Sequence, residues 1–128
     1  MAFTHTVSKQ VVTQGAVHFF NKAYTADGTD RREITVPDST TDMEVNIDVD
    51  VSQIKSIYLH STKDLLVETN SGGTPIDTLS LIANVPYSWT TDEYFTNTFA
   101  TDITAIFLTN ASGASATFIL EVLVDSTI

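Results

Sequence analysis

The fold class of this chain is decided by one stretch, Glu44-Val45-Asn46-Ile47-Asp48-Val49-Asp50. Apolar residues recur in it at every second position, and acidic or amide side chains stand between them. Because successive side chains of a β-strand point to opposite faces, this period of two predicts a strand with one buried and one solvated face. No window of useful length shows the 3.6-residue period of an amphipathic helix, so we expect an all-β fold.

The rest of the chain contains similar segments, which are rich in β-branched and aromatic residues and are bounded by turn-forming residues. The predicted strands cover residues 13–25, 31–36, 54–60, 65–69, 78–82, 87–90, 103–109 and 116–124. A turn at Asn110-Ala111-Ser112-Gly113 predicts a hairpin between the last two strands. Asp27-Gly28 predicts another hairpin turn, and a short helical turn is expected at residues 51–53.

Two segments carry further information. Residues 118–124, in the last predicted strand, are apolar on both faces and are interrupted only by Glu121. A strand of that kind lies in the centre of a sheet, or has one face covered by another subunit. Residues 91–101 show no strand pattern and are expected to form a loop that tucks Tyr94, Phe95 and Phe99 under the sheets.

The chain length of 128 residues suits one domain with its own core. Short strands separated by turn signals about every ten residues predict a single β-sandwich or jelly-roll-like domain of antiparallel strands over residues 13–128. Residues 1–12 have no evident strand partner and are predicted to form an N-terminal arm. The sequence contains no internal repeat and no linker.

The charge balance narrows the expected partners. The chain carries 16 acidic and 6 basic side chains, a net charge of −10. Such a surface repels phosphate backbones and anionic headgroups, so neither nucleic acid nor a membrane is an expected partner. Cysteine is absent, which excludes disulfides and thiolate ligands. The first six residues lack a basic region followed by an apolar stretch, so no signal peptide is expected.

Metal ligands show no diagnostic spacing. No His-x-His or His-x-x-x-His pair occurs among the three histidines, His5, His18 and His60. Three acidic side chains lie on one face of a predicted strand and are candidate ligands for a calcium ion: Glu44, Asp48 and Asp50. We favour a solvated face that discourages edge pairing, and for residues 27–30 we favour a turn. We therefore expect no metal and no cofactor.

Catalytic motifs are also missing from the sequence. It contains no Gly-x-Ser-x-Gly elbow and no glycine-rich phosphate loop. Serines and acids are so plentiful that a Ser-His-Asp set arises by coincidence, and such a set is defined by its geometry. We expect no catalytic residues; converging His, Asp and Ser groups in a concave pocket would favour an enzyme instead.

Residues 87–99 are rich in aromatic side chains. These are Tyr87, Trp89, Tyr94, Phe95 and Phe99. One interpretation is a surface for stacking on sugars or docking on a protein, since Tyr and Trp are enriched at binding hot spots. The other is core filling, because each ring buries a large apolar area. We favour the core for Trp89 and Phe99, and both interpretations stay open for Tyr87 and Tyr94.

A family resemblance extends over residues 54–124, a little more than half of the chain. It is carried by Ile57-Tyr58-Leu59-His60-Ser61, Val67-Glu68-Thr69-Asn70-Ser71, Asp77-Thr78-Leu79-Ser80-Leu81, Val85-Pro86-Tyr87-Ser88-Trp89, Ile106-Phe107-Leu108-Thr109-Asn110 and the two closing strands. In the order of its segments and in their residue composition, this region resembles the small capsid accessory proteins of tailed bacteriophages, which are called decoration or cement proteins.

The resemblance implies a β-sandwich or jelly roll, often trimeric, that binds the major capsid protein on the outside of the virion shell and has no catalytic residues. A protein that binds the assembled shell and not free coat subunits stabilises the shell by mass action. The residues expected to contact partners are Phe3, His5, Val7, Tyr87 and Tyr94. The alternative function is a carbohydrate- or receptor-binding β-sandwich, such as a phage fibre domain, in which Tyr87, Trp89 or Tyr94 lines a groove.

Overall fold

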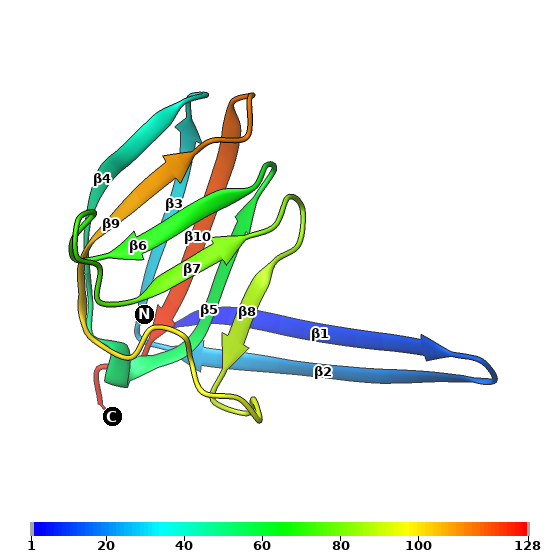
Figure 1. Ribbon diagram of the computed structural model, residues 1–128. Helices are drawn as coiled ribbons and strands as arrows, with labels where there is room; N and C mark the ends of the chain where they lie inside the picture. Colours follow the sequence, from blue (N-terminus) through cyan, green and yellow to red (C-terminus); the bar gives the residue numbers. More distant parts are fainter. Residues whose placement is uncertain (1, 128) are drawn as a thin grey trace.

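The computed structural model describes residues 2–127, which form two packed β-sheets and one projecting hairpin (Figure 1). The strands are β1 (Phe3–Thr13), β2 (Ala16–Ala26), β3 (Gly28–Val36), β4 (Thr40–Val49), β5 (Ile54–Ser61), β6 (Leu65–Thr69), β7 (Thr78–Leu81), β8 (Tyr87–Thr90), β9 (Ile103–Asn110) and β10 (Ala116–Val124). The predicted helical turn is confirmed as the 3-10 helix η1 (Val51–Gln53). Met1 and Ile128, the outer limits of the predicted arm and domain, lie outside the described residues.

Two four-stranded antiparallel sheets form the body of the molecule. One sheet has the strand order β3-β10-β5-β8, and the other has the order β4-β9-β6-β7. We call them sheet B and sheet C. Their inner faces pack together, which confirms the predicted all-β sandwich. No helix in the described part of the chain is long and apolar enough to span a membrane.

The core lies between the two sheets and follows the period of two seen in the sequence. In β4, Ile47 and Val49 are buried, whereas Glu44 and Asp48 face solvent. The largest fully buried side chains of the core come from both sheets and from the loop before β9: Phe99, Phe118, Ile57, Leu59, Ile103, Ile106, Leu108 and Leu120. Burial of each such side chain contributes roughly 1.5–3 kcal/mol relative to exposure, which makes this core the main source of stability.

Strand β10 occupies the centre of sheet B, as its apolar residues predicted. It pairs with β3 on one side and with β5 on the other. Phe118, Leu120 and Val122 point into the core. Leu123 points to the opposite face and is nevertheless fully buried, because the base of the projecting hairpin covers it.

The predicted hairpin of the last two strands is wrong. Strand β9 belongs to sheet C and β10 to sheet B, so the connection between them crosses from one layer to the other. The buried side chain of Asn110 holds this crossing: its Nδ2 donates to the carbonyl oxygens of Val36 and Ala114, at 3.0 and 2.8 Å. A connection of this kind resembles a turn in composition, but its polar groups are satisfied inside the fold.

The predicted hairpin turn at Asp27-Gly28 is also wrong. Strand β2 pairs with β1 and β3 pairs with β10, so the chain passes here from the projecting hairpin into the sandwich. Asp27 accepts hydrogen bonds from the backbone nitrogen and the hydroxyl of Ser126. At Gly28 a β-carbon would lie 2.8 Å from the Val124 side chain, so the close approach to β10 requires glycine.

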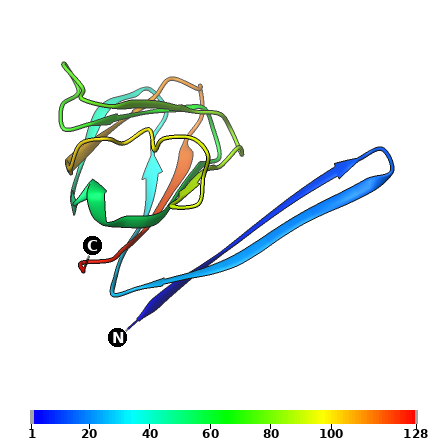
Figure 2. The same ribbon diagram turned by 90° about the horizontal axis from the view of Figure 1, so that it is seen from below.

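Strands β1 and β2 form the arm that projects from the sandwich (Figure 2). The sequence predicted an arm of residues 1–12 without a strand partner. In the structure, β1 pairs along its whole length with β2, from Phe3 opposite Ala26 to Thr13 opposite Ala16. Residues 13–25, which were assigned to the sandwich domain, therefore lie mostly in the second strand of the arm.

The loop of residues 91–101 is only partly as predicted. Phe99 is buried in the core, packed edge-on against Tyr87 with ring centroids 5.9 Å apart. Tyr94 and Phe95 point outward instead and are exposed. The Trp89 indole nitrogen donates to the Phe95 carbonyl oxygen at 2.9 Å, which fixes the backbone at the sandwich rim while the Phe95 side chain stays outside.

Candidate functional site

The outer half of the arm, residues 10–21, is exposed on both of its faces. The exposed apolar side chains are Val11 (57%), Val12 (69%), Val17 (61%), Phe19 (66%) and Phe20 (43%). Side chains opposite each other in an antiparallel pair share a face. The register therefore places Val12, Val17 and Phe19 on one face and Val11 and Phe20 on the other.

The inner half of the arm docks on the outer face of sheet B. Tyr24 and Ala26 pack on Leu123, and Phe3 and Val7 pack against this cluster. Phe3, His5 and Val7 alternate along β1 and are partly buried there. The structure thus places these three predicted partner contacts against the protein's own sandwich, and the alternation Phe3-x-His5-x-Val7 is the sequence signal for that docking.

Polar contacts between the arm and the 91–101 loop reinforce the docking. The Tyr24 hydroxyl donates to the Asp92 carboxylate at 2.7 Å, and Lys22 Nζ lies 2.6 Å from the same carboxylate. Lys9 forms a second ion pair with Glu93. The bond from Lys22, followed by that from Tyr24, holds the pKa of Asp92 below its ordinary value. Together these contacts fix the direction in which the arm leaves the sandwich.

Charge is divided unevenly between the arm and the sandwich. Residues 1–26 contain Lys9 and Lys22 and none of the 16 acidic side chains, so this part carries a net charge of +2 and the remainder −12. Residues 10–21 contain no Asp, Glu, Lys or Arg. The outer half of the arm is therefore the neutral, apolar part of an otherwise acidic molecule.

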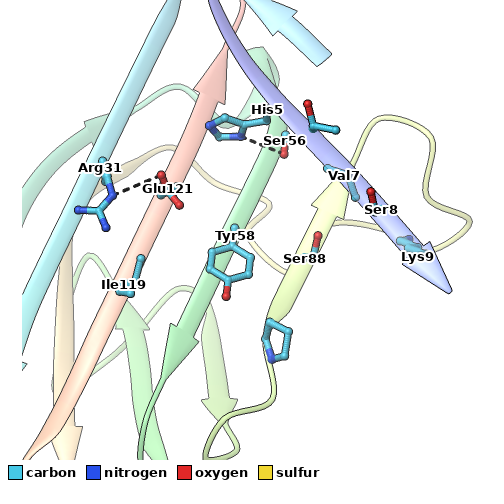
Figure 3. A pocket seen from close by; sticks show the side chains of 12 residues that line it. His5, Val7, Ser8, Lys9, Arg31, Ser56, Tyr58, Ser88, Ile119 and Glu121 are labelled. Atoms are coloured by element: carbon cyan, nitrogen blue, oxygen red, sulfur yellow. Dashed lines mark hydrogen bonds and ion pairs between the residues drawn. The ribbon is translucent and has the colours of Figure 1, made fainter. Parts of the chain in front are cut away.

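A hollow of about 680 Å³ lies between β1 and the outer face of sheet B (Figure 3). His5 Nδ1 lies 3.2 Å from the Ser56 hydroxyl, and Arg31 Nε lies 3.4 Å from a Glu121 oxygen. Burial lowers the pKa of His5, and the charge of Glu121 opposes that shift.

These groups do not form the relay of a serine hydrolase. Such a relay needs an acid bonded to the second ring nitrogen of the histidine and a hydroxyl that a substrate can reach. Glu121 pairs with Arg31, and no hydrogen bond joins it to His5 among the described residues. Ser56 is 2% exposed. The contact between His5 and Ser56 acts as a polar attachment of the arm.

A second hollow, of about 490 Å³, lies on the outer face of sheet C. Leu66 forms its floor, with Ser80 and Thr109 beside it on the two neighbouring strands. Ile82, which is 63% exposed, and Ala111 border it where β7 and β9 end. We call this surface the Leu66 groove; its lining is mainly apolar and includes one acid, Asp64.

The aromatic residues expected at the partner surface have different environments. The Tyr87 hydroxyl donates to Asn97 Oδ1 at 2.7 Å and is only partly exposed, whereas Tyr94 is fully exposed. Trp89 lines a hollow of about 420 Å³. Asn97 lines it too, and its buried Nδ2 has no hydrogen-bond partner among residues 2–127.

The acidic residues considered as calcium ligands are not brought together. Asp50 accepts hydrogen bonds from the Ser52 backbone nitrogen and hydroxyl, and Glu44 and Asp48 lie along the solvated face of β4. No group of three potential metal-ligating side chains occurs in the part of the chain that the structure describes. One carboxylate pair that the sequence did not reveal is Asp42 and Glu68: burial and then Asp42 raise the pKa of Glu68.

Comparisons with known proteins leave the family open. No protein-family model and no curated protein match the sequence. A de novo designed double-stranded β-helix, solved by solution NMR, is 18% identical with a TM-score of 0.42; the match covers 73% of this chain and 97% of that chain. A structure described as Bacillus endospore appendages that form disulfide-linked pili is 14% identical with a TM-score of 0.38, covering 77% and 88%. Likenesses this weak carry no argument about function.

Proposed function

We propose that this chain is a non-enzymatic structural protein of a tailed-phage virion, which binds the outside of the capsid and stabilises it. The observation that favours a structural role is the arm, whose outer half is exposed and apolar on both faces and packs against nothing else among residues 2–127. An exposed apolar surface of this extent marks an interaction site. Because residues 54–124 resemble decoration proteins, we take the capsid shell as the partner of this chain.

We assign the coat contact to the rim of the sandwich at Tyr94 and Phe95. These neighbouring aromatic side chains are 108% and 50% exposed. Large aromatic rings supply much contact area for little conformational entropy, which is why they dominate binding hot spots. The resemblance further favours a homotrimer and a location on the outer capsid surface. Tyr87 is less suited to the contact, because its hydroxyl already bonds Asn97.

The test is co-sedimentation of the purified protein with empty shells assembled from the coat protein encoded beside it. We expect saturable binding at a fixed ratio to coat subunits and a higher melting temperature of the decorated shell. The double variant Tyr94→Ser/Phe95→Ser should bind at least about tenfold more weakly. Val85→Ser, at a side chain that is 51% exposed, is the matched control. Absence of binding to both immature and expanded shells would overturn the proposal.

A second candidate function is carbohydrate binding at the hollow beside Trp89. The observation that favours it is the Trp89 side chain, which lines this hollow together with the hydroxyl residues Ser52, Thr91 and Thr96. Sugars are bound by this combination of a stacking face and a hydrogen-bond donor. A glycan array with no hits at millimolar sugar would remove this candidate, and a hit that Trp89→Ala abolishes would favour it over the shell.

A further inference from the structure

The outer half of the arm lies beyond the reach of its own sandwich. Strand β1 has 11 residues, which corresponds to roughly 35 Å of extended chain, and only its first half is docked. The rest leads away from both sheets (Figures 1 and 2). Paired apolar side chains on both faces of a free hairpin leave two hydrophobic surfaces in water. The cost of that exposure is removed when a second body covers them.

The Leu66 groove offers a surface of matching chemistry on the same molecule. It is mainly apolar and lies on sheet C, whereas the arm is anchored on sheet B beside Ser56 and Thr90. The groove also lies at the opposite end of the sandwich from the arm, where β6 begins and β7 and β9 end (Figure 1). An arm therefore cannot fold back onto the groove of its own chain and can reach only that of a neighbour.

Charge favours a second copy of this chain as the occupant. Two sandwich bodies of −12 each repel, so a direct contact between bodies is disfavoured. The outer half of the arm carries no acidic side chain and belongs to a segment of net charge +2. A contact made through it avoids placing two acidic bodies directly against each other.

We propose that residues 10–21 of one copy dock in the Leu66 groove of a second copy. Each contact joins the arm of one copy to the groove of another, and such head-to-tail contacts produce a closed ring when they repeat with a rotation that closes. The inference goes beyond the proposed function, because it concerns the purified protein in the absence of a shell. The arm then joins copies to one another, while Tyr94 and Phe95 remain available to the coat.

The first measurement is sedimentation velocity of the full chain and three single variants over a range of concentrations. Phe19→Asp places a charge on the arm, and Ile82→Asp places one at the edge of the groove. Ile76→Asp is the matched control, since Ile76 is 57% exposed and lies outside the groove. We expect the wild type and Ile76→Asp to associate, and the two other variants to associate at least about tenfold more weakly.

The second measurement mixes the two weakened variants. A chain with Phe19→Asp keeps an intact groove, and a chain with Ile82→Asp keeps an intact arm. Head-to-tail docking predicts that the mixture forms a one-to-one pair of twice the 14.0 kDa chain mass, although neither variant associates alone. A contact between two arms or between two grooves predicts no pair. Circular dichroism melting of each variant verifies that it is folded.

Three results would overturn the inference: a wild type that stays monomeric at high concentration, association that both variants retain, or a mixture that forms no pair. Shell binding is measured separately, so the two proposals fail independently. If the free protein is monomeric and Phe19→Asp, unlike Ile82→Asp, loses binding to shells, the arm binds the coat instead. If the protein associates as predicted but does not sediment with shells, the docking stands and the proposed function falls.

Discussion

At the scale of single residues, Glu68 is a carboxylate in an unfavourable place. Its side chain lies on the outer face of sheet C, the residue is 9% exposed, and it has the Asp42 carboxyl as a neighbour. Burial and then Asp42 raise its pKa above the ordinary value of 4.5. The folded state therefore binds this proton more tightly than the unfolded chain does. The contribution of this protonation to the free energy of unfolding is fully present below about pH 4.5, and it is lost as the pH rises through the raised pKa.

Glu68→Gln should therefore stabilise the protein at neutral pH. The amide removes the repulsion with Asp42, and we expect a gain on the order of 1 kcal/mol at pH 7.5 that shrinks toward pH 4. Thermal unfolding at both pH values measures it. Glu44→Gln, at an exposed position of β4, is the matched control and should change little. A Glu68→Gln variant that is less stable than the wild type at pH 7.5 would contradict this account.

Tyr24 is the buried residue that links the arm to the 91–101 loop. Its hydroxyl donates to Asp92 at 2.7 Å and lies 3.2 Å from the Thr90 hydroxyl, with the residue 3% exposed. Tyr24→Phe keeps the ring on Leu123 and removes these bonds, so we expect a loss of about 1–2 kcal/mol in the anchoring of the arm. Faster hydrogen exchange of the β1 and β2 amides, with unchanged exchange in β9 and β10, would be the signature. Uniform acceleration across all strands would show that the loss is global.

At the scale of elements, the arm is held by contacts whose strength depends on pH. Asp92 has a folded pKa below 3.8, so its contribution is present above that value and is lost as the pH falls through the lowered pKa. Asp92→Asn should therefore loosen the arm at pH 7, and acidification below the lowered pKa should loosen it in the wild type. Hydrogen exchange of β2 in the two proteins, at pH 7 and in acid, tests this. Equal β2 exchange in the variant and the wild type at pH 7 would exclude a role for the carboxylate.

The elements of the sandwich were easier to predict than their pairing. The bounds of β6 and β10 follow directly from their apolar and β-branched residues. The neighbours of β9 and β10 were assigned wrongly, because a short polar connection has the same composition whether it closes a hairpin or crosses between sheets. The distinguishing feature is the buried side chain of Asn110, whose amide donates to two backbone carbonyl oxygens in place of backbone donors. Whether a polar side chain is buried depends on the fold and not on the local composition.

The paired arm escaped prediction for a different physical reason. A period of two appears in a sequence only where one face of a strand is buried. In the outer half, adjacent residues such as Val11 and Val12, or Phe19 and Phe20, are apolar together, and residues 2–127 cover neither face of the hairpin there. The pattern is restored at Phe3, His5 and Val7, where the arm touches the sandwich. Of the predicted partner contacts, the structure leaves Tyr94 fully exposed, whereas Phe3, His5, Val7 and Tyr87 are partly buried.

At the scale of the whole molecule, the sandwich does not depend on the arm for its core. None of the residues in the main core cluster belongs to β1 or β2; among the described residues, Leu123 is the buried apolar side chain of the sandwich that clusters with the arm. A chain that begins at Asp27 and carries Leu123→Thr, which makes the uncovered site polar, should therefore fold and unfold cooperatively. Its destabilisation should stay below that of Leu120→Ala in the full chain, where a core cavity costs about 2–5 kcal/mol.

Denaturant unfolding followed by tryptophan fluorescence measures both chains, because Trp89 lies in β8 of sheet B. A truncated chain without a cooperative transition would show that the arm is part of the folding unit. If the chain folds as expected, no folding requirement accounts for the apolar side chains of residues 10–21. Exposed apolar residues that do not serve folding impose an aggregation risk. Their presence then argues for a partner that covers them, which the mixing experiment with Phe19→Asp and Ile82→Asp identifies.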